Sequence, residues 1–157
     1  MLCSSKGGVD LSIHLFEPEF NKKECIGQIS ECLDKGWTGL GYKTVEFEEA
    51  WKKYTGFENA LFLNSCTSAL ILAVDGLKTK YGWESECEII TTPNTFVSTN
   101  HAILKNGLKP VFADIDDTFC LNPESVEKKI TKNTCAIIFV GIGGNASNYK
   151  AIVKNTN

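Results

Sequence analysis

The distribution of apolar and polar positions predicts alternating strands and helices from residue 59 onward. Ala60–Leu63 is an apolar run of strand length, and the small polar residues Asn64–Ser68 follow it. The apolar positions then take helical spacing, with Leu70 and Val74 on one face. This part of the chain therefore predicts a strand, a tight polar turn and a helix.

The alternation continues through the rest of the sequence. We expect further strands at Cys87–Thr92, Pro110–Ile115 and Cys135–Val140, and helices at Asn94–Leu104, Asn122–Ile130 and from Tyr149 onward. Two helices are expected earlier, one capped by Asn21 and one capped by Thr44 and closed by Gly56. Because strands and helices alternate, the predicted fold class is α/β, an αβα sandwich with a mostly parallel sheet.

Small and polar residues follow the predicted strands, where open parallel sheets bind their ligands. These segments are Ser65–Ser68, Thr92–Phe96, Asp114–Asp117 and Gly141–Asn145. The turn at Ser65–Ser68 directs free backbone N–H groups to one point at the positive end of a helix, which favours an anion such as phosphate. The plainer interpretation is an ordinary N-capped helix, because Ser and Thr are common caps.

Composition narrows the function classes. The chain has 157 residues with a net charge of −3, and its sixteen cationic residues are all Lys. The lack of Arg and of a basic patch argues against nucleic-acid binding, and no apolar run has transmembrane length. Seven Cys without a Cys-x-x-Cys pair are interpreted as reduced, mostly buried thiols of a cytoplasmic protein. His14 and His101 lack the spacing of zinc ligands, so we expect no metal.

Four blocks together resemble the DegT/DnrJ/EryC1/StrS family of sugar aminotransferases. They read GWTGLGYKTVEFEEAWKKYTG, LNSCTSALILAV, EIITTPNTFVSTNHAILKNGLKPVFADID and ITKNTCAIIFVGIGGNASNYKAI, and the likeness covers roughly residue 15 to the end. The resemblance implies an enzyme of aspartate aminotransferase fold, type I, with pyridoxal 5′-phosphate (PLP) as cofactor. It also implies amino transfer to a nucleotide-linked keto-sugar from a donor such as glutamate, in a homodimer of the full-length enzyme.

The resemblance gives roles to individual residues. It implies that Ser65, Cys66, Thr67 and Ser68 hold the cofactor phosphate, and that the ring of Phe96 stacks on the pyridine ring. It implies that Trp37, Thr38 and Gly41 belong to a loop that contacts the substrate or the partner subunit's site.

The chain also departs from the family pattern. No Lys lies in the family's context for the Schiff-base lysine, the Asp that pairs with the pyridine nitrogen is not found, and GIGGN stands where many members carry His or Tyr. We therefore expect the N-terminal part of such an enzyme, inactive alone, with residues 1–14 a tail and 15–157 an incomplete PLP-dependent transferase large domain.

Three alternatives remain. Cys66 at a helix N-terminus is a candidate nucleophile, with His101 as its only candidate base. Gly141–Gly144 is a candidate phosphate loop of a nucleotide-binding α/β domain, although the full dinucleotide fingerprint is missing. The chain is also compatible with a non-catalytic or split-enzyme half that binds a partner chain.

Overall fold

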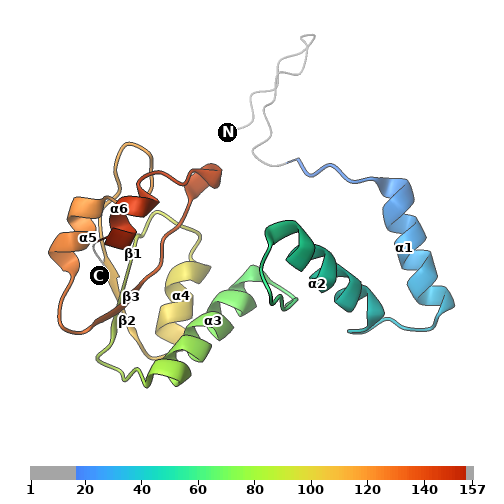
Figure 1. The fold of residues 1–157 in the computed structure, drawn as a ribbon, viewed down its shortest axis with the longest axis horizontal. Helices are drawn as coiled ribbons and strands as arrows, with labels where there is room; N and C mark the ends of the chain where they lie inside the picture. Colours follow the sequence, from blue (N-terminus) through green and yellow to red (C-terminus); the bar gives the residue numbers. More distant parts are fainter. Residues whose placement is uncertain (1–16, 155–157) are drawn as a thin grey trace, which may run out of the picture. The chain divides into compact units, whose positions relative to one another are not determined.

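The computed structural model describes residues 17–154, so the predicted tail at residues 1–14 lies outside the described part. The chain divides into two compact units, one extending to Phe62 and the other beginning at Leu63 (Figure 1). Among the described residues, no helix combines the length and the apolar character that crossing a bilayer requires.

The first unit contains α1 (Lys22–Asp34) and α2 (Tyr42–Thr55). The prediction of an Asn21 cap is confirmed, because its side chain accepts a hydrogen bond from the backbone N–H of Glu24 at 3.3 Å. Gly56 closes α2 in the left-handed region at a φ of 77°, as expected. Thr44 is not the N-cap of α2. The cap is Gly41, and the N–H of Thr44 donates to its carbonyl oxygen at 3.0 Å inside the first turn.

The predicted strand at Ala60–Leu63 is wrong, because these residues form no strand. A strand requires a neighbour that pairs with its backbone, and no described segment pairs with this one. Its contacts are local instead. The N–H of Phe62 donates to Oε1 of Glu48 at 2.8 Å, and the rings of Phe62 and Phe47 meet edge to face at 5.5 Å.

The second unit is built on a three-stranded sheet with the order β2-β1-β3. The strands are β1 (Glu88–Thr91), β2 (Lys109–Phe112) and β3 (Thr134–Ile137), and β1 pairs in parallel with both neighbours. The three predicted strands are therefore confirmed as a parallel sheet. Each is shorter than predicted, and β2 and β3 begin one residue earlier. The central strand is buried on both faces, as an all-parallel sheet requires.

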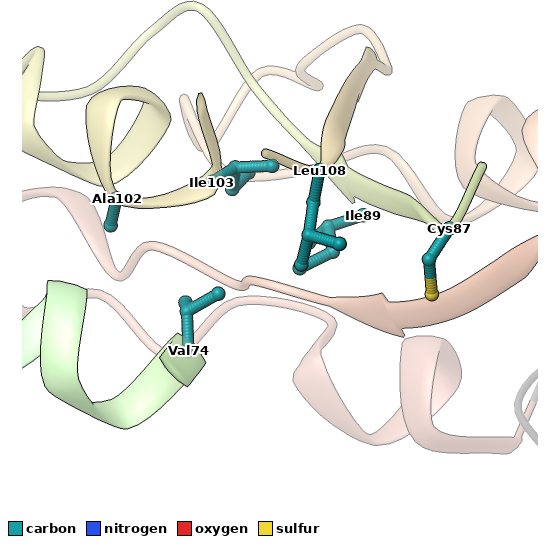
Figure 2. Close-up of a cluster of buried hydrophobic side chains, with 6 residues drawn as sticks. All are labelled: Val74, Cys87, Ile89, Ala102, Ile103 and Leu108. Carbon is teal, nitrogen blue, oxygen red and sulfur yellow. The ribbon is translucent and has the colours of Figure 1, made fainter. Parts of the chain in front are cut away.

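Helices cover both faces of this sheet (Figure 1). On one face lie α3 (Cys66–Tyr81) and α4 (Ser98–Lys105), and Figure 2 shows their buried side chains meeting those of the sheet. That cluster contains Val74, Cys87, Ile89, Ala102, Ile103 and Leu108. On the other face lie α5 (Pro123–Lys129) and α6 (Tyr149–Lys154), around a cluster of Ile90, Ala113, Leu121, Val126 and Ile152. The predicted αβα sandwich is confirmed.

Helix α4 begins four residues later than predicted, because hydrogen bonds of a turn occupy its expected start. The N–H of Asn94 donates to Oγ1 of Thr92 at 3.1 Å, and the N–H of Thr95 donates to the carbonyl oxygen of Pro93 at 2.9 Å. Side chains that bond to nearby backbone in this way compete with helix formation. The segment after β1 is therefore a loop.

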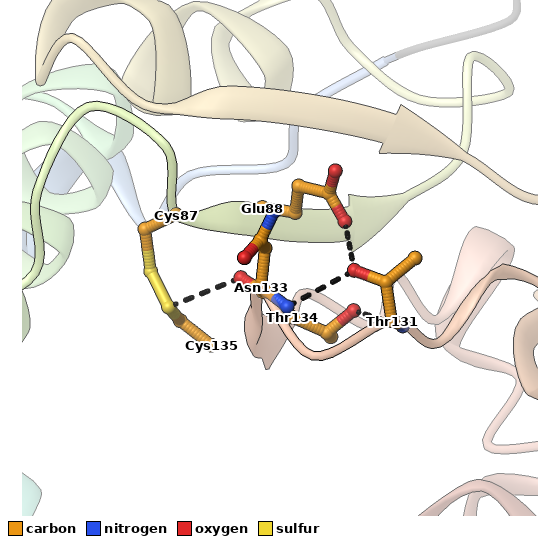
Figure 3. The surroundings of a disulfide bond; sticks show 6 residues. All are labelled: Cys87, Glu88, Thr131, Asn133, Thr134 and Cys135. Atoms are coloured by element: carbon orange, nitrogen blue, oxygen red, sulfur yellow. Dashed lines mark hydrogen bonds between the residues drawn. A yellow bond between two sulfur atoms is a disulfide. The ribbon is translucent and has the colours of Figure 1, made fainter.

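The prediction that all cysteines are reduced is wrong for Cys87 and Cys135, which form a disulfide with their Cα atoms 5.8 Å apart (Figure 3). Sequence spacing gives no hint of this pair, because it is created by the pairing of β1 with β3. Among the described free cysteines only Cys120 is buried, while Cys25 and Cys66 are exposed, so the expectation of mostly buried thiols is also wrong.

Candidate functional site

The polar turn before α3 is an N-cap with defined geometry. Ser65 is extended at φ −159° and ψ 154°, and its Oγ accepts a hydrogen bond from the N–H of Ser68 at 3.1 Å. The carbonyl oxygen of Ser65 accepts from the N–H of Ala69 at 3.1 Å, which starts the helical ladder. The hydroxyl of Ser65 in turn donates to Oγ of Ser68 at 3.0 Å.

This turn leaves donors free for a ligand. Within the described residues, the backbone N–H groups of Cys66 and Thr67 have no acceptor, and neither does the hydroxyl of Thr67. Both residues are exposed, and the 16 residues of α3 add the positive end of a helix dipole. This set of donors fits a phosphate group, which accepts several hydrogen bonds at once.

The loop after β1 presents an aromatic ring. Asn94 closes the loop by donating from Nδ2 to the carbonyl oxygen of Phe119 at 3.0 Å. Nδ2 of Asn100 lies 3.4 Å from the carbonyl oxygen of Thr92 and donates to it from the first turns of α4. The side chain of Phe96 stands outside this hydrogen-bonded frame with 77% of its surface exposed. A ring this exposed is available to cover a flat ligand.

Two helices bring the polar turn and this loop to the same end of the second unit. Val74 in α3 packs in one buried cluster with Ala102 and Ile103 in α4. Nζ of Lys78 donates to the carbonyl oxygen of Asn106, just beyond α4, at 2.7 Å. The second halves of the two helices therefore lie together, and their N-terminal ends lie at the same end of the layer (Figure 1). The phosphate-compatible turn and the exposed ring share that end.

A hydrogen-bond network joins the segment after β2 to the segment before α6. Asp116 accepts from the N–H of Thr118 at 2.8 Å and from the hydroxyl of Thr118, and these bonds lower the pKa of its carboxyl group. Oγ1 of Thr118 is 2.6 Å from Oγ of Ser147, and Asn148 donates to Oδ2 of Asp116 at 3.4 Å. A hollow of about 580 Å³ lies along Ala146–Ala151 and Lys154.

The predicted substrate loop belongs to the first unit. Nε1 of Trp37 donates to the carbonyl oxygen of Leu40 at 2.8 Å, and 54% of the Trp37 surface is exposed. A Cβ atom on Gly41 would collide with the indole of Trp37, so a larger residue at this position would displace the indole. Thr38 is exposed beside them. The indole of Trp37 thus fixes the conformation of this loop and remains accessible to a ligand.

The other candidate sites receive little support from the geometry. Within the described residues, the side chains of Cys66 and His101 have no hydrogen-bond partner, so nothing pairs them as nucleophile and base. The N–H of Gly144 is used within its own 3-10 turn, η1 (Ile142–Gly144), where it donates to Gly141 at 3.1 Å. No group of three or more metal-binding side chains occurs in the part of the chain that the structure describes.

The model of the DegT/DnrJ/EryC1/StrS aminotransferase family matches residues 19–156. The chain belongs to this family. Relatives of this DegT/DnrJ/EryC1/StrS member include uncharacterized protein MJ1066 of Methanocaldococcus jannaschii, 39% identical over 140 residues. They also include the spore coat polysaccharide biosynthesis protein SpsC of Bacillus subtilis, 40% identical over 132 residues. These matches cover 88% and 83% of the chain.

Solved structures of this family have the same fold. Putative sugar aminotransferase Spr1654 of Streptococcus pneumoniae, in its PMP form, superposes with a TM-score of 0.80 at 30% identity over 88% of the chain. Helicobacter pylori PseC, an aminotransferase involved in the biosynthesis of pseudoaminic acid, superposes with a TM-score of 0.79 at 32% identity, also over 88%. The fold is therefore the type I fold of PLP-dependent transferases.

The chain spans about a third of the length of these relatives. The matches cover 35% of MJ1066, 33% of SpsC, 34% of Spr1654 and 36% of PseC.

Proposed function

We propose that the chain supplies the cofactor-binding N-terminal part of a sugar aminotransferase that uses pyridoxal 5′-phosphate. The observation that carries the proposal is the free donor set at the start of α3, at the same end of the second unit as the exposed ring of Phe96. Spr1654 occurs in a PMP form and a PLP form, which supports the same cofactor here.

Each part of this proposed site has its own task. The N–H groups of Cys66 and Thr67 and the hydroxyls of Thr67 and Ser68 bind the cofactor phosphate, while Ser65 mainly caps the helix. The ring of Phe96 orients the pyridine ring and keeps water from one of its faces. When bound, the cofactor supplies the electron sink for moving an amino group between an amino acid and a sugar ketone.

The proposed substrates are a nucleotide-linked keto-sugar and an amino donor such as glutamate. The support comes from the relatives, among them a polysaccharide biosynthesis protein and an aminotransferase involved in the biosynthesis of pseudoaminic acid. The loop of Trp37, Thr38 and Gly41 is the proposed contact for the sugar or for the partner subunit of a homodimer. The exposed indole of Trp37 suits either role, because aromatic faces are favoured at both.

The 157 residues alone are proposed to give no turnover. None of their sixteen Lys lies in the family's context for the catalytic lysine, so that lysine is assigned to residues outside this sequence. A cytoplasmic location stays part of the proposal. This location is inferred from the interpretation of the cysteines as reduced thiols. The disulfide between Cys87 and Cys135 weakens that argument, because disulfides are rare in cytoplasmic proteins.

The test is an assay of amino transfer from glutamate to a nucleotide keto-sugar. The chain is measured alone and then together with the polypeptide that completes the family fold, while binding of pyridoxal 5′-phosphate to the chain is measured by equilibrium dialysis. Activity only in the second assay is expected. Turnover by the 157 residues alone would overturn the assignment of the lysine, and failure to transfer an amino group in either assay would overturn the proposed reaction.

A further inference from the structure

Cys87 and Cys135 are neighbours through the fold and not through the sequence. Cys87 directly precedes β1 and Cys135 lies in β3, with a sequence separation of 48. Their Cα atoms are 5.8 Å apart, within the range of about 4.4–6.8 Å that disulfides require. Figure 3 shows the two side chains meeting between the strands.

A β-bulge places Cys135 opposite Cys87. Glu88 pairs with Thr134 while Ile89 pairs with Ala136, so Cys135 is the extra residue of β3. An extra residue in a bulge is left unpaired and its side chain is turned away from the regular alternation. The bulge therefore directs a side chain of β3 towards the start of β1.

Polar contacts around the pair hold the strands together independently of the sulfur–sulfur bond. The N–H of Glu88 donates to the carbonyl oxygen of Asn133 at 2.9 Å, and Oγ1 of Thr131 donates to Oε2 of Glu88 at 2.6 Å (Figure 3). The two cysteines therefore remain adjacent when the bond is broken. Their accessibility differs, because Cys87 is only 5% exposed inside the core whereas Cys135 is exposed.

We propose that Cys87 and Cys135 form a thiol–disulfide exchange site that reacts with a small disulfide such as oxidised glutathione. The thiolate of the accessible Cys135 attacks one sulfur of glutathione disulfide, whose S–S bond breaks and releases one glutathione thiolate. The thiolate of Cys87 then attacks the sulfur of Cys135 and displaces the second glutathione thiolate. Two electrons pass from the cysteines to glutathione, and their two protons pass to the leaving thiolates.

Exchange at this site changes the stability of the second unit. The bond joins the central strand to β3 and closes a loop that includes α4, β2 and α5. Cross-linking a loop of this length restricts the unfolded chain and so favours the folded state. The oxidised protein should therefore have a melting temperature higher by roughly 5 °C or more than the reduced protein.

The experiment equilibrates the 157-residue protein in buffers of varied ratio of reduced to oxidised glutathione. Free thiols are quenched with N-ethylmaleimide, and intact mass, peptide mapping without reduction and the melting temperature are recorded. The oxidised state should carry two maleimides fewer than the reduced state, with a peptide linking Cys87 to Cys135. Absence of that link at every ratio, or equal melting temperatures of the two states, would overturn the proposal.

Single substitutions test the order of attack. In Cys87→Ser, Cys135 should accumulate one glutathione as a mixed disulfide, because its resolving partner is gone. In Cys135→Ser, the buried Cys87 should react at least tenfold more slowly. Cys25→Ser is the matched control, since Cys25 is an exposed cysteine of α1 outside the pair, and it should carry one maleimide fewer in every state but form the Cys87–Cys135 link at the same glutathione ratio as the unchanged protein. Equal glutathione uptake by the two variants would contradict the assigned order, and the measurements on the unchanged protein stand even where a variant fails to fold.

Discussion

Nδ2 of Asn106 donates to the carbonyl oxygen of Ile71, thirty-five residues earlier in the chain, at 3.1 Å. The same amide donates to the carbonyl oxygen of Ala102 at 2.8 Å, and Asn106 is buried. One side chain thus joins α3 to the end of α4. The candidate site lies at the N-terminal ends of α3 and α4. Asn106 therefore helps to fix the position of the turn before α3 relative to the loop before α4.

Replacing Asn106 with Ala should lower the free energy of unfolding by about 1–3 kcal/mol. The substitution removes one buried and one half-buried hydrogen bond and leaves space beside Ile71. Urea denaturation gives the value. Asn133→Ala serves as the control, because its exposed side chain has no hydrogen bond within the described residues, and it should change stability by less than about 0.5 kcal/mol. Equal effects of the two substitutions would contradict the role of Asn106.

Ser65 and Thr67 should separate stability from ligand binding. Ser65→Ala should cost about 0.5–2 kcal/mol of stability, because its Oγ caps α3 through the N–H of Ser68. Thr67→Ala should leave stability unchanged, because its hydroxyl has no partner within the described residues. It should instead weaken pyridoxal 5′-phosphate binding by about 1–2 kcal/mol. Denaturation curves measure the stability of both variants, and equilibrium dialysis measures their binding of pyridoxal 5′-phosphate. A loss of stability in Thr67→Ala, or a loss of binding without a loss of stability in Ser65→Ala, would contradict this assignment.

Phe96→Ala should weaken binding of pyridoxal 5′-phosphate by roughly 1–3 kcal/mol through the loss of stacked aromatic area. The melting temperature should hardly change, because 77% of the Phe96 side chain is exposed. Phe96→Tyr is the control and should retain affinity, since it keeps the ring. A drop in stability without a drop in affinity would show that Phe96 serves packing alone.

The carboxyl group of Glu31 makes the stability of the first unit depend on pH in the acid range. Hydrogen bonds from Lys35 at 2.7 Å and Lys43 at 2.9 Å lower its pKa from 4.5 to about 2. Since the folded-state pKa is the lower one, the stabilisation is complete above pH 4.5 and is lost as the pH falls through about 2. Nuclear magnetic resonance titration of the Glu31 carboxyl group measures the pKa directly. Lys43→Met should move it upward, and an unchanged value would show that Lys43 contributes nothing.

The sequence was most informative where local chemistry decides the structure. The caps at Asn21 and Asn122 follow from side chains that bond to nearby backbone, and both are present. The three strands of the second unit were predictable from short apolar runs between turn residues, although only the central strand β1 is buried on both faces.

Features that depend on distant partners were not predictable in this way. Ala60–Leu63 has the composition of a strand but no paired neighbour in the described part of the chain. The Cys87–Cys135 pair depends on a one-residue bulge that no periodicity shows. At the candidate site, the roles of Asn94 and Asn100 in fixing the loop before Phe96 were missed. An Asn directly after a Pro at a strand end was the available signal for the first of them.

The strand order β2-β1-β3 has a consequence for the protein during its synthesis. The central strand is made before either neighbour, since β2 ends at Phe112 and β3 at Ile137. Until Phe112 leaves the ribosome both edges of β1 are open, and the edge that β3 covers stays open until Ile137 follows, so that Ile89 and Ile90 face water or another chain. A nascent chain paused after Thr91 and before Phe112 has emerged is therefore the form of this protein most exposed to aggregation and most dependent on chaperones.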